Sequence, residues 1–192
     1  MAADPPLSSL PDFSNSAIAR DQLAEAVARS ALVFGEFKLR SGIVSDRYFD
    51  KYQFEARPEL LAALGVALAE LVPYGVQVLA GLELGGVPLA SAVSLHTGIP
   101  CAFVRKAAKE YGTRRIAEGT DVAGRRVCVV EDVITTGGQV VASTEALREA
   151  GAQVDTVVCV IDRSDPDAPD KLAEAGLERL PLFRGAEFER YQ

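Results

Sequence analysis

The chain has 192 residues, of which 48% are apolar and 24% charged, and its formal net charge is −7 at pH 7. This length and composition predict one globular domain, and the acidic balance argues against nucleic-acid binding by the whole surface. No apolar run approaches the roughly 20 residues that a membrane-spanning helix needs, and no signal peptide is evident, so we expect a cytoplasmic protein.

Histidine and cysteine usage excludes several kinds of site. His96 is the only histidine, which rules out a metal cluster built from several histidines of one chain. Cys101, Cys128 and Cys159 lie in or beside β-branched runs and show no C-x-x-C spacing, so we expect buried core thiols.

The first part of the chain predicts a leader, a helix and paired strands. Residues 1–13 contain three prolines, which is typical of a mobile leader, and we expect one domain over residues 14–192 with its core at about 58–164. Polar caps at the start of residues 14–30 predict a helix there. Aromatic and charged residues mix over 37–54, which favours short paired strands.

The second part alternates between strands and helices. Pro58 fits the first turn of a helix that Pro73 and Gly75 end. Beyond it we expect, in chain order, a strand, a helix, a strand, a basic loop, a strand, a helix and a strand, at 76–80, 87–97, 101–104, 105–115, 126–130, 139–150 and 154–161. The apolar strands indicate an α/β fold with a mostly parallel central sheet flanked by helices, and the tail, 172–192, is expected to add a helix and a short strand.

One segment runs from an apolar strand through two acids into a turn rich in threonine and glycine. Glu131 and Asp132 can accept hydrogen bonds from vicinal sugar hydroxyls, whereas the turn 135–138 offers hydroxyls and free N–H groups at a helix start, which suit a phosphate. In an open parallel sheet such a turn lies where ligands bind. The segment predicts a site for both ends of a ribose 5-phosphate; an acidic strand end before an ordinary helix cap is the alternative.

Two common nucleotide-binding motifs are absent. Neither G-x-x-x-x-G-K-[ST] nor G-x-G-x-x-G occurs, which weighs against P-loop nucleoside triphosphatases and Rossmann dehydrogenases. From Arg105 to Arg115 the chain instead gathers five basic residues and one acid, so either a local anionic partner or a solvated loop is expected there.

Residues 129–137, Val-Val-Glu-Asp-Val-Ile-Thr-Thr-Gly, resemble the signature with which type I phosphoribosyltransferases bind phosphoribosyl pyrophosphate (PRPP). In that family the two acids meet the ribose hydroxyls and the turn holds the 5-phosphate. The resemblance implies the type I fold, with a small hood over the base site. It also implies a PRPP site made by Arg40, Tyr111, Glu131, Asp132, Val133, Ile134, Thr135, Thr136, Gly137 and Gly138.

Further segments resemble the orotate phosphoribosyltransferases. Residues 105–112, Arg-Lys-Ala-Ala-Lys-Glu-Tyr-Gly, are similar to their mobile catalytic loop, whose cations stabilise the leaving pyrophosphate, and residues 37–42 are similar to their N-terminal segment. Arg163 matches the arginine that these enzymes use against the orotate carboxylate. The resemblance implies catalytic roles for Arg105, Lys106, Lys109 and Asp132, and orotate binding by Tyr48, Phe49, Thr135 and Arg163.

The chain departs from this family pattern at three places. Arg40 replaces the usual lysine, and Tyr111 stands where histidine is frequent. Leu84 and Gly85, in the loop 81–88 that corresponds to the one approaching pyrophosphate, replace a Tyr-Lys pair. This replacement removes one positive charge, for which Arg114 or Arg115 is the expected substitute.

The resemblance implies that the chain converts orotate and PRPP to orotidine 5′-monophosphate and pyrophosphate in pyrimidine (UMP) biosynthesis. It implies Mg²⁺ carried mainly by PRPP rather than by protein side chains, and a homodimer whose basic loop reaches the neighbouring site, with no nucleic-acid or membrane partner. Two alternatives stay open: a phosphoribosyltransferase for a purine base, and a PRPP-sensing regulator of the same fold.

Overall fold

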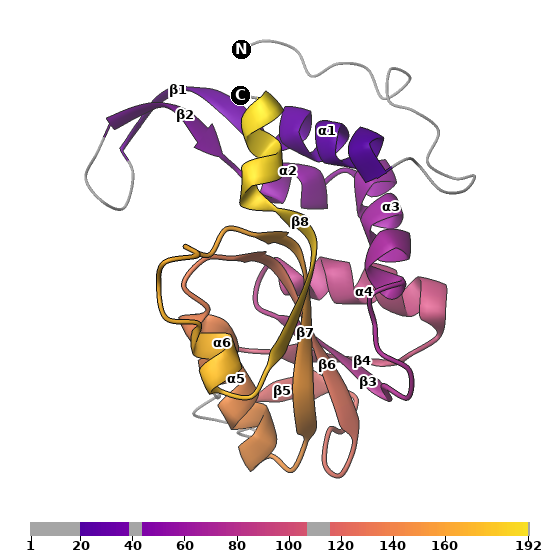
Figure 1. Ribbon diagram of the computed structural model, residues 1–192. Helices are drawn as coiled ribbons and strands as arrows, with labels where there is room; N and C mark the ends of the chain where they lie inside the picture. The colour runs from indigo at the N-terminus through magenta and orange to yellow at the C-terminus, as the bar shows by residue number, and fades with distance from the viewer. Residues whose placement is uncertain (1–19, 39–43, 107–115, 192) are drawn as a thin grey trace.

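The computed structural model describes residues 20–38, 44–106 and 116–191 of the chain. The expected leader and the first helix caps lie outside these residues. The described chain forms a central sheet with helices on both faces and a two-stranded hairpin beyond one end of it (Figure 1). None of the described helices combines the length and apolar character that crossing a bilayer requires.

The central sheet has six strands in the order β5-β4-β3-β6-β7-β8. All neighbouring pairs are parallel except β4 with β5, so the predicted mostly parallel sheet is confirmed. The strand bounds are β3 Val78–Leu82, β4 Cys101–Val104, β5 Ala117–Gly119, β6 Arg126–Ile134, β7 Gln153–Asp162 and β8 Glu178–Arg184.

Two apolar clusters hold helices against the two faces of the sheet. One face is covered by α3 (Pro58–Ala69) and α4 (Gly86–Thr97), the other by α5 (Gly138–Glu149) and the short α6 (Lys171–Glu174). On α3 the helical spacing predicted from the sequence places three fully buried leucines on the sheet, Leu60, Leu64 and Leu68. Burying each of them contributes about 1.5–3 kcal/mol to folding.

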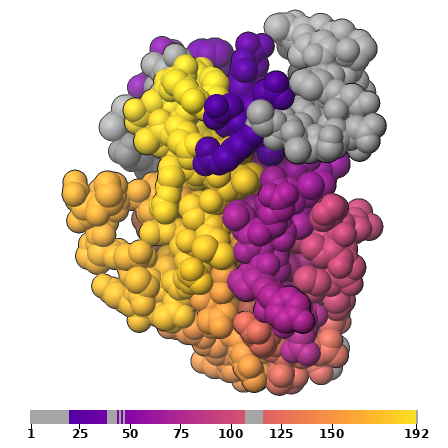
Figure 2. All heavy atoms as spheres, turned by 45° about the vertical axis from the view of Figure 1, so that its right-hand side comes forward, coloured from indigo at the N-terminus to yellow at the C-terminus, as the bar shows by residue number. Residues whose placement is uncertain are grey.

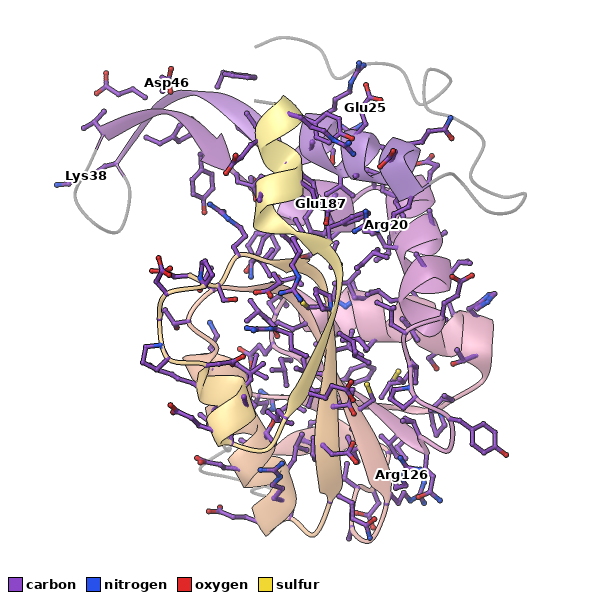
Figure 3. The ribbon with its side chains drawn as sticks, in the orientation of Figure 1. Arg20, Glu25, Lys38, Asp46, Arg126 and Glu187 are labelled. Carbon is purple, nitrogen blue, oxygen red and sulfur yellow. The ribbon has the colours of Figure 1, made fainter. Side chains whose placement is uncertain are left out.

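A hood forms at one end of the sheet from segments far apart in the sequence. It comprises α1 (Arg20–Ala31), the antiparallel strands β1 (Leu32–Lys38) and β2 (Val44–Phe49), α2 (Tyr52–Glu55) and the 3₁₀-helix η2 (Gly185–Tyr191). Figure 2 shows the C-terminal segment lying directly against α1. Arg20 and Glu187 join the two, with 2.5 Å between Nη1 and Oε2, and their side chains point toward each other in Figure 3.

Several predicted element bounds were wrong. Residues 37–54 do not form only strands, because β1 starts at Leu32, β2 ends at Phe49 and residues 52–55 are helical. The strand predicted over 76–80 lies two residues later, and β5 was not predicted at all. The tail forms the expected helix and strand, α6 and β8, but β8 is seven residues long and extends the parallel sheet, and η2 follows it.

The strand predicted to end at Val130 continues to Ile134, so Glu131 and Asp132 lie within β6 rather than after it. The extension follows from the backbone ladder, because residues 131–134 stay paired in register with β7 through Asp162. Apolar periodicity could not predict this strand end, since the chain continues the ladder with charged side chains.

Candidate active site

The parallel strands bring the predicted functional segments to one edge of the sheet. From β3 the chain passes through α4 to β4 on one side, and from β6 it passes through α5 to β7 on the other. Connections that diverge in this way leave a crevice at the carboxyl ends of the two central strands, where ligands of open α/β sheets bind. Four loops therefore meet there, namely those that begin at Glu83, Arg105, Thr135 and Arg163.

The turn 135–138 joins β6 to α5 and presents an exposed polar surface. Thr135, Thr136 and Gly138 are exposed, whereas Gly137 is buried with φ 71° and caps the helix without a side-chain hydrogen bond. A Cβ on Gly137 would lie 2.1 Å from Leu172 Cδ1, so both its φ and its surroundings require glycine. The hydroxyls and the N–H groups of the first turn of α5 leave a place suited to a phosphate.

Two acids next to this turn belong to a buried charged cluster. Asp132 has no exposed side-chain surface, and its Oδ2 lies 2.5 Å from Nζ of Lys51, which follows β2. Glu55 on α2 faces the same carboxylate and is also buried. Glu131 Oε2 is buried without a hydrogen-bond partner, so this oxygen can accept a hydrogen bond from a ligand hydroxyl.

Burial and mutual repulsion shift the proton affinities in this cluster. Burial, followed by the nearby Asp132 charge, raises the pKa of Glu55 to about 8. The same two causes raise the pKa of Glu131 well above its usual range. Burial lowers the pKa of Lys51, but the hydrogen bond and charge of Asp132 outweigh burial, so its net shift is upward. Carboxyl groups with raised pKa values that cluster at the ligand edge of a sheet are typical of functional sites.

The loop after β3 approaches the acids closely because it contains glycines. A Cβ on Gly85 would lie 1.7 Å from Asp132 Oδ2 and 2.6 Å from Glu55 Oε1. A Cβ on Gly86 would lie 2.3 Å from the Val130 carbonyl oxygen. Side chains at either position would push the loop away from β6. The pattern Leu-Gly-Gly therefore lets this turn lie directly against Asp132 and Glu55.

The described part of the basic loop begins at the end of β4. Arg105 is half-buried, with Nε 3.6 Å from Glu118 Oε1, and Lys106 is exposed. The backbone N–H of Lys106 donates to Glu83 Oε2 over 3.3 Å, which ties this loop to the one after β3. Lys106 is thus placed beside the Gly85 turn.

A cavity of 1330 Å³ adjoins the turn on the side of β7 and the hood. Its lining contains the residues expected to bind the base, namely Tyr48, Phe49, Thr135 and Arg163, together with Thr136. The Arg163 guanidinium carbon lies 5.7 Å from the Phe49 ring centre, and Phe49 is supported from behind by Phe54 and Phe188 at 6.4 and 6.0 Å. An aromatic face and a cation therefore border one side of the cavity.

Asp162, which the sequence did not single out, fixes the loop that carries Arg163. Its buried carboxylate accepts hydrogen bonds from the N–H and hydroxyl of Ser164 over 3.0 and 2.6 Å. The same carboxylate pairs with Arg179 at 3.1 Å and with Arg184. The sequence does place an acid, Asp162, directly before Arg163 at the end of a strand. Its partners on β8, Arg179 and Arg184, could not be predicted without the strand order.

The remaining predicted site residues divide into two groups. Val133 and Ile134 lie in β6 and connect the acids to the turn, and the backbone N–H of Arg163 donates to the Ile134 carbonyl over 2.8 Å. Arg40, Lys109 and Tyr111 lie outside the described residues, as do the expected substitutes Arg114 and Arg115.

Over residues 20–38, 44–106 and 116–191, no group of three or more His, Cys, Asp or Glu is arranged to hold a metal ion. The unpartnered Glu131 Oε2 can still accept a hydrogen bond from a metal-bound water or a sugar hydroxyl.

Cys128 and Cys159 are buried as expected, whereas Cys101 is only half-buried.

Comparison with known proteins agrees with this geometry. Residues 53–186 match the family model for the phosphoribosyl transferase domain. The chain is 57% identical over 155 residues to the orotate phosphoribosyltransferase of Nocardioides sp., which covers 81% of this chain and 86% of that protein. It is 41% identical over 172 residues to the enzyme of the same name from Methanocella arvoryzae, covering 89% and 98% of the two chains.

Solved structures give the same result. The Mycobacterium tuberculosis orotate phosphoribosyltransferase in complex with Fe(III) dicitrate superposes with a TM-score of 0.79 at 34% identity, covering 88% of this chain and 98% of that one. The same protein in complex with PRPP superposes with a TM-score of 0.74 at 30% identity, with the same coverage. The chain belongs to the phosphoribosyltransferase family and, within it, to the orotate phosphoribosyltransferases.

Proposed function

We propose that this protein transfers the phosphoribosyl group of PRPP to orotate, giving orotidine 5′-monophosphate and pyrophosphate in pyrimidine biosynthesis. The observation that carries the proposal is the position of the turn 135–138. This turn has the Glu131–Asp132 pair on its β6 side and the cavity of Arg163 and Phe49 beside it. One edge of the sheet thus offers places for a phosphate, a sugar and an anionic planar base.

The sugar phosphate is held from both ends. In the proposed complex the 5-phosphate accepts hydrogen bonds from the Thr135 and Thr136 hydroxyls and from the first N–H groups of α5, whose positive end favours an anion. Glu131 and Asp132 accept hydrogen bonds from the two ribose hydroxyls. Holding the ribose in this way fixes the anomeric carbon against the base, which lowers the entropic barrier of the reaction.

The base binds in the cavity beside the turn. Orotate is planar and carries a carboxylate, so its ring stacks near Phe49 while the Arg163 guanidinium makes paired hydrogen bonds to the carboxylate. Tyr48 and Thr135 complete the lining of this part of the cavity. A purine base has no carboxylate and would leave Arg163 without a partner, so the geometry favours orotate.

The reaction is a displacement at the anomeric carbon. The bond from C1 to the pyrophosphate oxygen breaks with its electron pair, the ring nitrogen N1 of orotate forms the new bond, and the N1 proton is lost to solvent. Arg105, Lys106 and Lys109 stabilise the charge that develops on pyrophosphate. No side chain acts as a nucleophile.

Mg²⁺ would be held mainly by PRPP itself and would supply partial neutralisation of the pyrophosphate charge, since Mg²⁺ keeps several of its waters in such sites. Glu131, whose buried Oε2 has no hydrogen-bond partner among the described residues, would accept hydrogen bonds from those waters.

The active assembly that we propose is a cytoplasmic homodimer in which the basic loop of one subunit serves the other's site. Each subunit is a single domain over residues 14–192, since α1 and η2 pack on the same apolar cluster as α3 and α4. Mixing Lys109→Ala subunits with Asp132→Asn subunits tests the sharing. Mixed dimers should regain activity, whereas no recovery after confirmed mixing would refute it.

The experiment that tests the proposed activity follows pyrophosphate release with PRPP and Mg²⁺ and, in separate reactions, orotate, adenine, hypoxanthine or xanthine. Turnover with orotate alone, abolished in Asp132→Asn, is expected. Turnover with a purine and none with orotate would contradict the substrate. Salt-dependent binding to nucleic acid without turnover of any base would favour a regulator instead.

A further inference from the structure

Lys51 has no assigned role in the reaction described above, yet it is ion-paired with an acid at the centre of the site. Its ammonium lies 2.5 Å from Asp132 Oδ2, and its side chain is 33% exposed, whereas that of Asp132 is 0% exposed. The surrounding groups are acidic, since Glu55 and Glu131 both act on Lys51 and Asp132. Lys51 is therefore the positive partner within a buried group of three carboxyls.

The pairing leaves Asp132 closed to a ligand. Its Oδ1 accepts a hydrogen bond from the backbone N–H of Val133. Its Oδ2 is covered by the Lys51 ammonium on one side and by the Gly85 turn on the other, because a Cβ on Gly85 would lie only 1.7 Å from this oxygen. A ribose hydroxyl that reaches Oδ2 must take the place of the ammonium. Binding of the sugar to Asp132 therefore requires Lys51 to move.

A displaced ammonium needs another anion, since leaving it unpaired beside buried groups is costly. The Gly85 turn follows β3 and lies beside Lys106 of the basic loop, on the side of the site opposite the base cavity. Leu84 and Gly85 bring no cation to this turn. Lys51 has a flexible four-carbon stem whose ammonium already borders the turn, so it can reach an anion bound there.

We propose that Lys51 is a PRPP-binding residue, which neutralises Asp132 in the free site and moves to the pyrophosphate of PRPP when the ribose hydroxyls reach Asp132. The inference rests on the proposed function and adds to it the cation that the Leu84–Gly85 turn lacks. Lys51 then attracts only ligands that carry the pyrophosphate. It contributes nothing to ligands that carry only the sugar and the 5-phosphate.

This difference between ligands provides the test. Calorimetry would compare the binding of PRPP and of ribose 5-phosphate to the wild-type protein and to Lys51→Met, at equal Mg²⁺. Lys51→Met should weaken PRPP about tenfold or more, as expected for a lost charge-assisted contact, and leave ribose 5-phosphate unchanged or bound more tightly. The KM for PRPP should rise in parallel, and the KM for orotate should not change.

Two further variants serve as controls. Arg126→Met removes one positive charge at the first residue of β6, the strand that carries Asp132 near its other end, and should change neither affinity. Figure 3 shows Arg126 at the end of the molecule away from the hood. Lys51→Arg keeps the charge and should restore PRPP binding to within about threefold of the wild-type value. If Lys51→Met does not fold, the comparison is made in the Asp132→Asn background, where removing Lys51 leaves no unpaired buried carboxylate at position 132 and should still weaken PRPP.

The inference would be overturned if Lys51→Met bound PRPP as tightly as the wild type, or lost PRPP and ribose 5-phosphate equally. Either result can occur while the wild-type protein turns over orotate, so it would leave the proposed function intact. Failure of the wild-type protein to bind PRPP would instead refute the proposed function itself.

Discussion

The Arg163 guanidinium lies 5.7 Å from the centre of the Phe49 ring, although the two residues are separated by most of the central sheet in sequence. Phe49 ends β2 of the hood, and Arg163 follows β7 of the sheet. The base cavity therefore lies between the two parts of the fold. Its specificity depends on how the hood is held over the sheet.

Replacing Arg163 by leucine should impair orotate use selectively. The variant loses the cation proposed to pair with the orotate carboxylate, so kcat/KM for orotate should fall about 100-fold, whereas the KM for PRPP should change less than threefold. Steady-state kinetics with each substrate varied in turn checks this. The matched control is Arg126→Leu at the far end of β6, and a loss confined to PRPP would contradict the assignment.

Replacing Asp162 by asparagine should loosen the Arg163 loop. The buried carboxylate holds Ser164, Arg179 and Arg184, so the free energy of unfolding should fall by about 1–3 kcal/mol. Urea denaturation measures this change. Asp167→Asn on the same loop is exposed and should change stability by less than about 0.5 kcal/mol. Equal effects of the two substitutions would refute a structural role for Asp162.

The raised pKa of Glu55 predicts how stability depends on pH. Its pKa is about 8 in the folded protein, against an ordinary value of 4.5, so between these values the folded protein keeps a proton that the unfolded chain releases. This contribution is fully present below pH 4.5 and is lost as the pH rises through about 8, with a slope of up to about 1.4 kcal/mol per pH unit.

Glu55→Gln removes this titration and keeps the neutral shape. Urea denaturation at about pH 6 and about pH 8 should therefore show a smaller loss of stability in the variant than in the wild-type protein. The remaining loss in the variant reports on Glu131, whose pKa is raised in the same direction. Parallel pH profiles of the two proteins would show that Glu55 is not protonated in the folded state.

Gly138→Ala should stabilise the folded protein and at the same time weaken PRPP binding. The nearest atom to an added Cβ is Thr136 Oγ1 at 3.9 Å, so the folded chain has room for the methyl group, and stability should rise by about 0.4–1 kcal/mol. The same methyl group stands at the exposed start of α5, where the 5-phosphate is proposed to bind. The KM for PRPP should therefore rise, and an unchanged KM would argue against a phosphate at this helix start.

The sequence predicted the sheet class and the functional segments because both depend on local patterns. Apolar runs identify the buried strands, and Glu131, Asp132 and the turn 135–138 stand together in one continuous motif. The close packing of Gly85 and Gly86 against Asp132 and the Val130 carbonyl was not predicted and became visible only in the structure.

The sequence could not predict contacts that depend on strand order and on the hood. Lys51 meets Asp132 only because α2 lies above the carboxyl end of β6, and Asp162 meets Arg184 only because β8 adds a parallel strand beside β7. Each of these pairs joins residues without a shared motif, so nothing local in the sequence indicates them.

The most direct test of the account is a crystal structure of this protein with PRPP and Mg²⁺. The 5-phosphate should lie on the Thr135–Gly138 turn, with the ribose hydroxyls against Glu131 and Asp132 and the pyrophosphate toward Lys106. An empty turn, with PRPP bound at another place on the molecule, would contradict it.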